Sequence, residues 1–142
     1  MLLGALSLYP MGLWFGGRSV PAWGVAGVST GAAARGRGGG TRMMGDSVRE
    51  MHDEGVALSS LYPAVQPIYR RAGYERGGYL YLTDVLLGRI APVDRSLALR
   101  RGTPDDEPAL EALERERGAL NNGNVDRGEL LWKRTRAPHR KP

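Results

Sequence analysis

The most informative part of the chain is residues 25–40, which read VAGVSTGAAARGRGGG. Its first six residues are typical of a strand, and its last six form a glycine-rich loop. A helical pattern follows at once, because Met44, Val48 and Met51 stand at i, i+4 and i+7. Glycines let backbone N–H groups converge, and a helix N-terminus adds unpaired amides and the positive end of its dipole. The order strand, loop, helix therefore predicts a seat for a phosphate or diphosphate group, with a chance loop or a disordered Arg-Gly segment as the alternative.

The rest of the composition narrows the class of protein. The chain has 142 residues, room for one domain or for one domain and part of another. It has 21 glycines, no cysteine and two histidines, which excludes a disulfide framework and a thiolate or His-rich metal site. Its formal net charge is +5, but residues 127–142 hold six positive charges and one negative. The basic character therefore belongs to the C-terminal segment and predicts no nucleic acid partner for the whole chain.

The N-terminal segment raises the question of membrane targeting. Residues 1–17 are uncharged and mostly apolar, but Pro10 and four glycines interrupt the run and it lacks the basic start of a signal peptide. The run is also shorter than the roughly 20 residues that a membrane-spanning helix needs. We therefore expect β-structure here, a cytoplasmic protein and no membrane partner.

Hydrophobic periodicity and turn residues predict the order β-β-β-α-β-α-β, then a linker, then β-α-α. Strands are expected at 2–9, 20–30, 56–60, 79–87 and 97–100, helices at 41–54, 68–72, 103–118 and 126–134, and turns at 9–12, 16–19 and 121–124. The strand at 20–30 is apolar on both faces, which is typical of a central strand, and its glycines indicate a bulge or a close backbone approach.

Two motifs in this order resemble those of the GNAT superfamily of acetyl-CoA-dependent N-acetyltransferases. The family's diphosphate loop, Gln/Arg-x-x-Gly-x-Gly/Ala, is matched by Arg35, Gly38 and Gly40. Its later helix, with a Tyr before x-x-x-Gly-aromatic, is matched by IYRRAGY at residues 68–74. The run over residues 61–75 is similar to the Eis-like (enhanced intracellular survival) branch, and the resemblance covers about residues 10–90.

The resemblance implies an α/β (α+β) fold with a mixed, mostly antiparallel sheet, flanking helices and the start of a second similar domain. Residues 1–90 would be an incomplete acetyltransferase domain, 91–96 a linker, and 97–142 the truncated start of the second domain. The family builds its acceptor cleft largely from elements that precede the central strands, and this sequence is too short before Val20 to hold them. We therefore expect the chain to be a fragment or a shortened reading frame.

The resemblance also implies a reaction, the transfer of an acetyl group from acetyl-CoA to a primary amine of an aminoglycoside- or polyamine-like molecule. Tyr69 takes the position of the general acid, and its phenol suits protonation of a departing thiolate. No metal is expected, and the family allows a homo-oligomer. The residues expected to bind the cofactor are Val28, Ser29, Thr30, Gly36, Arg37, Gly38, Gly39, Gly40, Thr41, Ala64 and Val65.

Each of these residues also has a simpler interpretation. Tyr69 could serve only to pack its helix, and Arg35, Arg37 and the basic C-terminal segment could belong to an RNA-binding module or to a fragment that only binds acetyl-CoA. Trp132 belongs to a helix expected to have lost its packing partner. Other side chains are expected to be structural: Tyr74, Tyr79 and Tyr81 as sheet or core aromatics, Met43, Met44 and Met51 as core residues, His52 as a solvated residue, and Asp105, Asp106 and Glu107 as helix-start acids.

Overall fold

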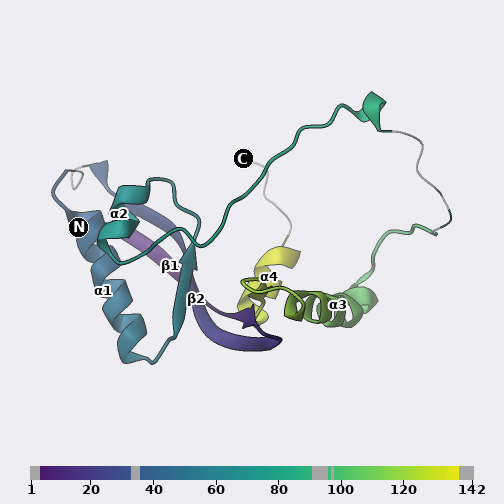
Figure 1. Ribbon diagram of the computed structural model, residues 1–142, viewed down its shortest axis with the longest axis horizontal. Coiled ribbons are helices and arrows are strands. Elements are labelled where there is room, and N and C mark those ends of the chain that lie inside the picture. Colours follow the sequence, from purple (N-terminus) through teal and green to yellow (C-terminus); the bar gives the residue numbers. More distant parts are fainter. Residues whose placement is uncertain (1–3, 33–35, 91–95, 97, 138–142) are drawn as a thin grey trace.

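The structure is a computed structural model that describes residues 4–32, 36–90, 96 and 98–137. Its strands are β1 Gly4–Phe15, β2 Arg18–Thr30, β3 Leu58–Leu61 and β4 Val125–Asp126, and its helices are α1 Gly39–Asp53, α2 Gln66–Arg71, α3 Glu107–Ala119 and α4 Glu129–Arg136. Two short 3-10 turns, Leu87–Arg89 and Pro104–Asp106, complete the described elements. Figure 1 shows their arrangement, with a long connection between α2 and α3 that swings out from the sheet.

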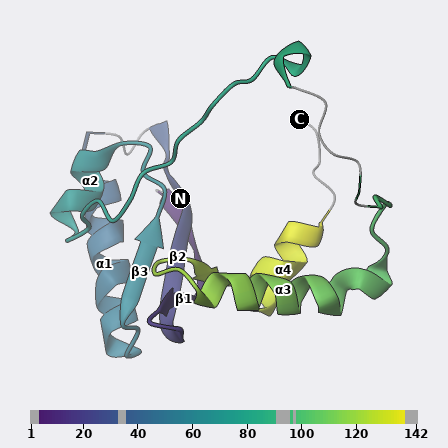
Figure 2. The same cartoon turned by 45° about the vertical axis from the view of Figure 1, so that its right-hand side comes forward.

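The sheet has the strand order β3-β2-β1-β4. Both β2 and β4 pair with β1 in antiparallel fashion, whereas β3 is parallel to β2. α1 makes the crossover between the two parallel strands, and α1 and α2 lie together beside one face of the sheet (Figures 1 and 2). The expected fold class, a mixed and mostly antiparallel sheet with flanking helices, is confirmed, and so is the central place of β2.

Glycine in the left-handed backbone conformation sets the ends of the first elements. Gly16 and Gly17 have φ values of 55° and 75° and form the two-residue turn between β1 and β2, since a type I′ hairpin turn needs positive φ at both positions. Gly55, with φ 72°, follows the end of α1, and Gly73, with φ 92°, follows the end of α2. These three predicted boundaries are confirmed.

The core lies between α1, α2 and the sheet. Met44 and Met51, the stripe predicted on the first helix, are buried and contact Val25 of β2 and Tyr69 of α2 in one cluster. Tyr74 packs against the same cluster, as expected. Burial of a methionine or valine side chain contributes about 1.5–3 kcal/mol, so this cluster fixes where α1 begins relative to β2.

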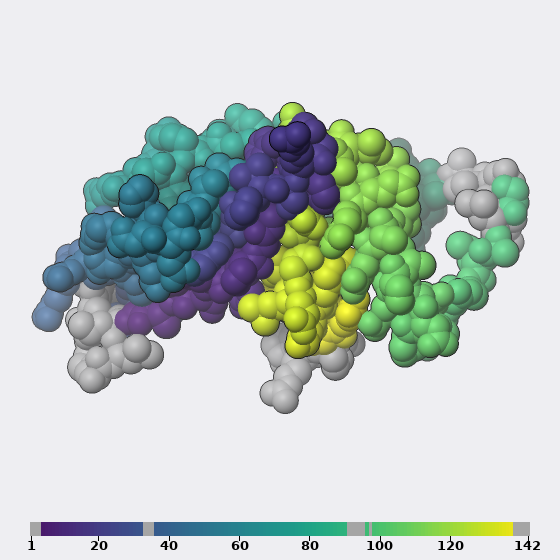
Figure 3. Space-filling model, turned by 90° about the horizontal axis from the view of Figure 1, so that it is seen from below, coloured from purple at the N-terminus to yellow at the C-terminus, as the bar shows by residue number. Residues whose placement is uncertain are grey.

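The C-terminal elements dock on β1. Trp14 packs against Gly118 of α3, and the guanidinium carbon of Arg134 in α4 lies 4.9 Å from the centre of the Tyr9 ring. The turn before β4 closes the end of the hairpin, because the Asn122 side chain accepts a 2.8 Å hydrogen bond from the Gly16 amide. Figure 3 shows α4 against the N-terminal strands as one continuous surface. The assignment of residues 97–142 to a second domain stays a prediction.

The start of α3 is capped as the sequence predicts. Thr103 and Asp106 form a reciprocal capping box, with Pro104 at the first position of the turn. The guanidinium group of Arg100 and the backbone N–H of Thr103 hold the pKa of Asp106 well below its usual range. Asp105, Asp106 and Glu107 are thus helix-start acids.

Two predicted strands are wrong. Residues 79–86 are irregular and lead into a 3-10 turn, with Tyr81 83% and Leu82 85% exposed, and the described residues 98–100 of the second segment are also irregular. The pattern of residue types reports strand propensity, but a strand also needs a partner for its backbone groups, and the described chain pairs neither segment with the sheet. Tyr79 and Tyr81 are consequently exposed, not sheet or core aromatics.

The turn predicted at residues 9–12 is also wrong, because β1 runs through it to Phe15. Pro10 is tolerated since its carbonyl points at Gly128, away from β2, so its missing N–H takes no bond from the β1–β2 ladder. Asp126, predicted to begin the last helix, instead pairs with Gly12 in β4. An added Cβ at Gly12 would clash first with the Ser19 hydroxyl of β2 and would lie 3.1 Å from the Cβ of Asp126, so the glycine leaves room for both neighbouring strands.

The contact between Trp14 and α3 can be tested with two helical glycines. A Cβ at Gly118 would lie 2.9 Å from Nε1 of Trp14, whereas a Cβ at Gly45 would meet nothing nearer than 3.8 Å. We expect Gly118→Ala to lower the free energy of unfolding by about 1–3 kcal/mol through overpacking. Gly45→Ala should raise it by about 0.5–1 kcal/mol, because alanine is the better helix former. Urea denaturation measures both, and equal stabilisation by the two changes would contradict the docking of α3 on Trp14.

Candidate functional site

The candidate site begins where β2 and β3 part. Their parallel pairing runs from Ala22–Leu58 to Val25–Leu61 and stops there, although β2 continues to Thr30. Directly after this point the register between β1 and β2 shifts, and Gly27 takes a φ of 63°. This is the bulge that the glycines of β2 predicted. Beyond the bulge, Ser29 and Thr30 pair again with β1, and the other edge of residues 26–30 faces the space between β2 and α2.

The N-terminus of α1 lies at the end of this free edge. Gly38 precedes the helix with φ 74°, no side chain caps the first turn, and no acidic residue lies in it. The first amides of a helix have no intrahelical partner. Gly36 also has a positive φ, 75°, so glycines at alternate positions turn the backbone just before the helix. This end of α1 presents N–H groups and the positive end of the helix dipole.

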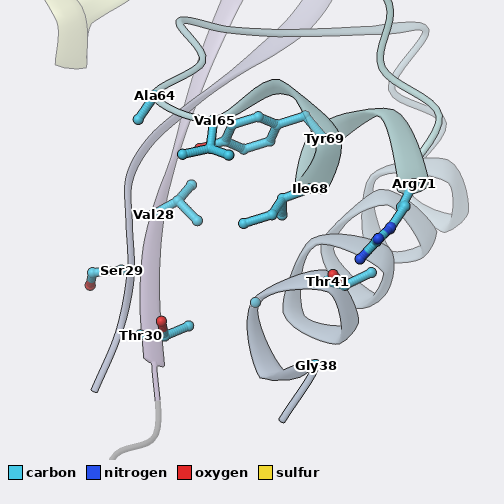
Figure 4. A pocket seen from close by; sticks show the side chains of 11 residues that line it. Val28, Ser29, Thr30, Gly38, Thr41, Ala64, Val65, Ile68, Tyr69 and Arg71 are labelled. Carbon is cyan, nitrogen blue, oxygen red and sulfur yellow. The ribbon is translucent and has the colours of Figure 1, made fainter. Parts of the chain in front are cut away.

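Tyr69 lies on α2 across from β2. Its side chain is 9% exposed, and its ring packs edge-on against that of Tyr74 at 6.4 Å. Figure 4 shows the hydroxyl end of the ring beside Val65, directed toward the space above Val28. The ring is therefore held in the core while its polar end reaches the opening between the strand and the helix.

These three parts enclose one groove of about 310 Å³. It is lined by the end of β2, the first turn of α1, the segment before α2 and α2 itself (Figure 4). The lining residues are Val28, Ser29, Thr30, Gly38, Gly40, Thr41, Ala64, Val65, Ile68, Tyr69 and Arg71.

Most residues proposed from the sequence come together here. The strand residues Val28, Ser29 and Thr30, the helix-start residues Gly38, Gly40 and Thr41, the pair Ala64 and Val65, and Tyr69 all line the groove. Three others lie beside it without lining it: Gly36 and Arg37 in the turn before α1, and Gly39 at its first position. Arg35 lies outside the described residues.

Two lining residues, Ile68 and Arg71, were not proposed from the sequence. Ile68 and Arg71 stand at i and i+3 in α2, so helical periodicity places both on the face of α2 that carries the groove. That spacing was the signal that could have identified them.

A second hollow, of about 340 Å³, lies on the other side of α2, between the end of α1 and β3. The hydroxyls of Tyr74 and Ser59 form a 2.6 Å hydrogen bond there, and burial raises the pKa of Tyr74 above its ordinary value. Ser59 also donates to the Trp23 carbonyl, so its hydroxyl links Tyr74 to the sheet. His52 lies at this rim and is exposed, as expected.

Most described basic residues of the C-terminal segment have partners inside the chain. Trp132 lies between the guanidinium groups of Arg127 and Arg136, at 5.7 Å and 5.0 Å. Trp132 therefore has packing partners, contrary to the expectation. The ion pairs of this segment are Arg127–Glu114, Lys133–Glu129, Arg136–Glu107 and Arg136–Glu111.

No cluster of three or more His, Cys, Asp or Glu side chains that could hold a metal ion occurs in the part of the chain that the structure covers. Among the helices of those same residues, none combines the length and apolar character needed to cross a membrane.

Comparison with known proteins connects this geometry to a family. Residues 1–77 match the family model described as an acetyltransferase (GNAT) domain. The crystal structure of a GCN5-related N-acetyltransferase from Anabaena variabilis is similar, with a TM-score of 0.84 and 28% sequence identity over 97% of this chain and 36% of that one. A GCN5-related N-acetyltransferase from Kribbella flavida is 42% identical over 54% of this chain and 19% of that one, with a TM-score of 0.52. The matched part of this chain thus spans 36% of the Anabaena protein and 19% of the Kribbella protein. No curated protein matches the chain.

Proposed function

The chain belongs to the GNAT acetyltransferase family, and on this premise we propose that its groove binds acetyl-CoA and that Tyr69 assists transfer of the acetyl group to a primary amine. The observation that carries the proposal is the meeting of three groups in one groove: the free edge of β2, the N-terminus of α1 and the Tyr69 hydroxyl. We propose an aminoglycoside- or polyamine-like molecule as the acceptor, on the similarity of residues 61–75 to the Eis-like branch.

The residues present fit acetyl-CoA. The edge of β2 at Val28–Thr30 offers backbone groups to the amides of the pantetheine arm, since the pairing with β3 ends at Val25. Ala64 and Val65 form an apolar wall opposite it. The N-terminal amides of α1 suit the diphosphate, and a Cβ at Gly40 would lie 3.4 Å from the Thr30 side chain, narrowing the cradle.

Acetyl-CoA supplies the acetyl group as a thioester, and the chain's own residues position it and move a proton. The end of β2 would hold the pantetheine arm, and Tyr69, whose hydroxyl end is directed into the groove, would supply the proton for the departing sulfur. The acceptor amine must be neutral to attack, and it loses its extra proton to solvent or to a base.

Binding of acetyl-CoA is the first test. At 100 times its Kd, a ligand that binds only the folded state adds about 2.7 kcal/mol to the free energy of unfolding, so we expect a clear rise in Tm. Gly38→Asp should abolish this rise, because it places a carboxylate where the diphosphate would lie.

Gly55 provides a matched control for that variant. Gly38 and Gly55 have φ values of 74° and 72°, and an added Cβ meets nothing within 4 Å at either. Gly55→Asp therefore brings the same charge and similar backbone strain, but at the far end of α1, and should keep the rise in Tm. If acetyl-CoA does not raise the Tm of the unaltered chain, the proposed binding is wrong. If the Tm values of the two variants respond equally, the proposed place of the diphosphate at the start of α1 is wrong.

The role of Tyr69 is tested by removing its hydroxyl. We expect Tyr69→Phe to lower kcat by roughly 10²–10⁴-fold, the usual contribution of general acid catalysis, with little change in the Kd of acetyl-CoA. Tyr74→Phe is the control, since it removes a neighbouring hydroxyl that bonds only Ser59 among the described residues. It should cost about 1 kcal/mol of stability and leave kcat nearly unchanged. The kcat of each variant is measured from acetyl transfer to a polyamine, with the release of free thiol as the readout. Equal kcat values in the two variants would rule out the role of Tyr69.

A further inference from the structure

Among the residues that the structure describes, Arg71 is the one cationic side chain that lines the groove. It extends from α2 toward Thr41 in the first turn of α1, from the same helix that carries Tyr69 (Figure 4). Its neighbour Arg70 does not line the groove, and the Nε of Arg70 lies 2.9 Å from Glu75. The two adjacent arginines therefore differ in surroundings, although both are exposed.

No carboxylate of the described residues forms an ion pair with Arg71. The first turn of α1 has no acidic residue, so the side chain approaches the positive end of a helix dipole without a counter-charge. Cations are unfavourable at a helix N-terminus and anions are favourable there. An anion held between Arg71 and this turn would relieve the repulsion.

On the basis of the proposed function, we propose that Arg71 is a specificity residue that binds the diphosphate of the acyl donor and selects CoA over carriers with a single phosphate. The amides of α1 can take one phosphate group of a diphosphate. The guanidinium group, a planar fork of N–H donors suited to two phosphate oxygens, can then take the other. A single phosphate, as in 4′-phosphopantetheine, satisfies the amides and leaves Arg71 without its ligand.

The experiment measures Kd by calorimetry for the chain, Arg71→Gln and Arg70→Gln. Three ligands are compared: acetyl-CoA, acetyl-3′-dephospho-CoA and S-acetyl-4′-phosphopantetheine. Both substitutions remove one positive charge from adjacent exposed positions, so an effect of the overall field would be the same in both.

We expect Arg71→Gln to raise the Kd of the two diphosphate ligands on the order of tenfold, the usual cost of a lost charge-assisted hydrogen bond. The Kd of S-acetyl-4′-phosphopantetheine should stay within about twofold, as should all three values for Arg70→Gln.

Other results would overturn the assignment. An equal loss for all three ligands would place Arg71 at the pantetheine arm, and a loss confined to acetyl-CoA would place it at the 3′-phosphate. Equal losses in the two variants would show a field effect only. A chain that binds none of the three ligands would refute the proposed function itself, whereas tight acetyl-CoA binding by Arg71→Gln would refute only this inference.

Discussion

The early end of the pairing between β2 and β3 is the constraint on which the site depends. Parallel strands normally satisfy each other's backbone groups, yet these two stop at Val25 and Leu61. The bulge at Gly27 follows at once and turns the end of β2 while β1 keeps it in the sheet. The other edge of β2 at residues 26–30 thereby lines the groove without a strand partner among the described residues, and the chain that leaves β3 forms the opposite wall. The free edge, the groove and the position of α1 all follow from this parting.

The same residues hold the fold together and shape the groove. Met44 and Met51 bury α1 against β2, so the start of α1 cannot shift without opening the core. Tyr69 belongs to that core through its ring and to the groove through its hydroxyl. A site built on packed elements keeps its groups in place before a ligand arrives. Because the same residues serve both purposes, substitutions of the Tyr69 ring or of the methionines would change stability and binding together. Removal of a hydroxyl or of an exposed charge would change binding or catalysis with little effect on stability.

The sequence predicted the elements around the groove better than it predicted the contacts between segments far apart in the chain. The strand, loop and helix at residues 25–53 and the short helix at 66–71 depend on neighbours along the chain, and their glycines and apolar spacing were sufficient. The pairing of Asp126 with Gly12 and the absence of a partner for residues 79–86 depend on segments far apart in sequence, which residue patterns do not report. Arg71 was not predicted for another reason. The family motif singles out Tyr69, and Arg71 is identified only by its place on the face of α2 that lines the groove.

Net charge alone gives little indication of a partner in this chain, and the pairing of each charge is more informative. Arg136 of α4 pairs with Glu107 and Glu111 of α3, Arg127 pairs with Glu114, and the acids at the start of α3 are the ones a helix dipole favours. At α1 the arrangement is reversed, with Arg71 directed at a first turn that has no acid. An anion bound at this turn would be attracted both by Arg71 and by the positive end of the helix dipole. Among the described residues, the unpaired arginine of the groove therefore says more about an anionic ligand than does the basic C-terminal segment that accounts for the net charge of +5.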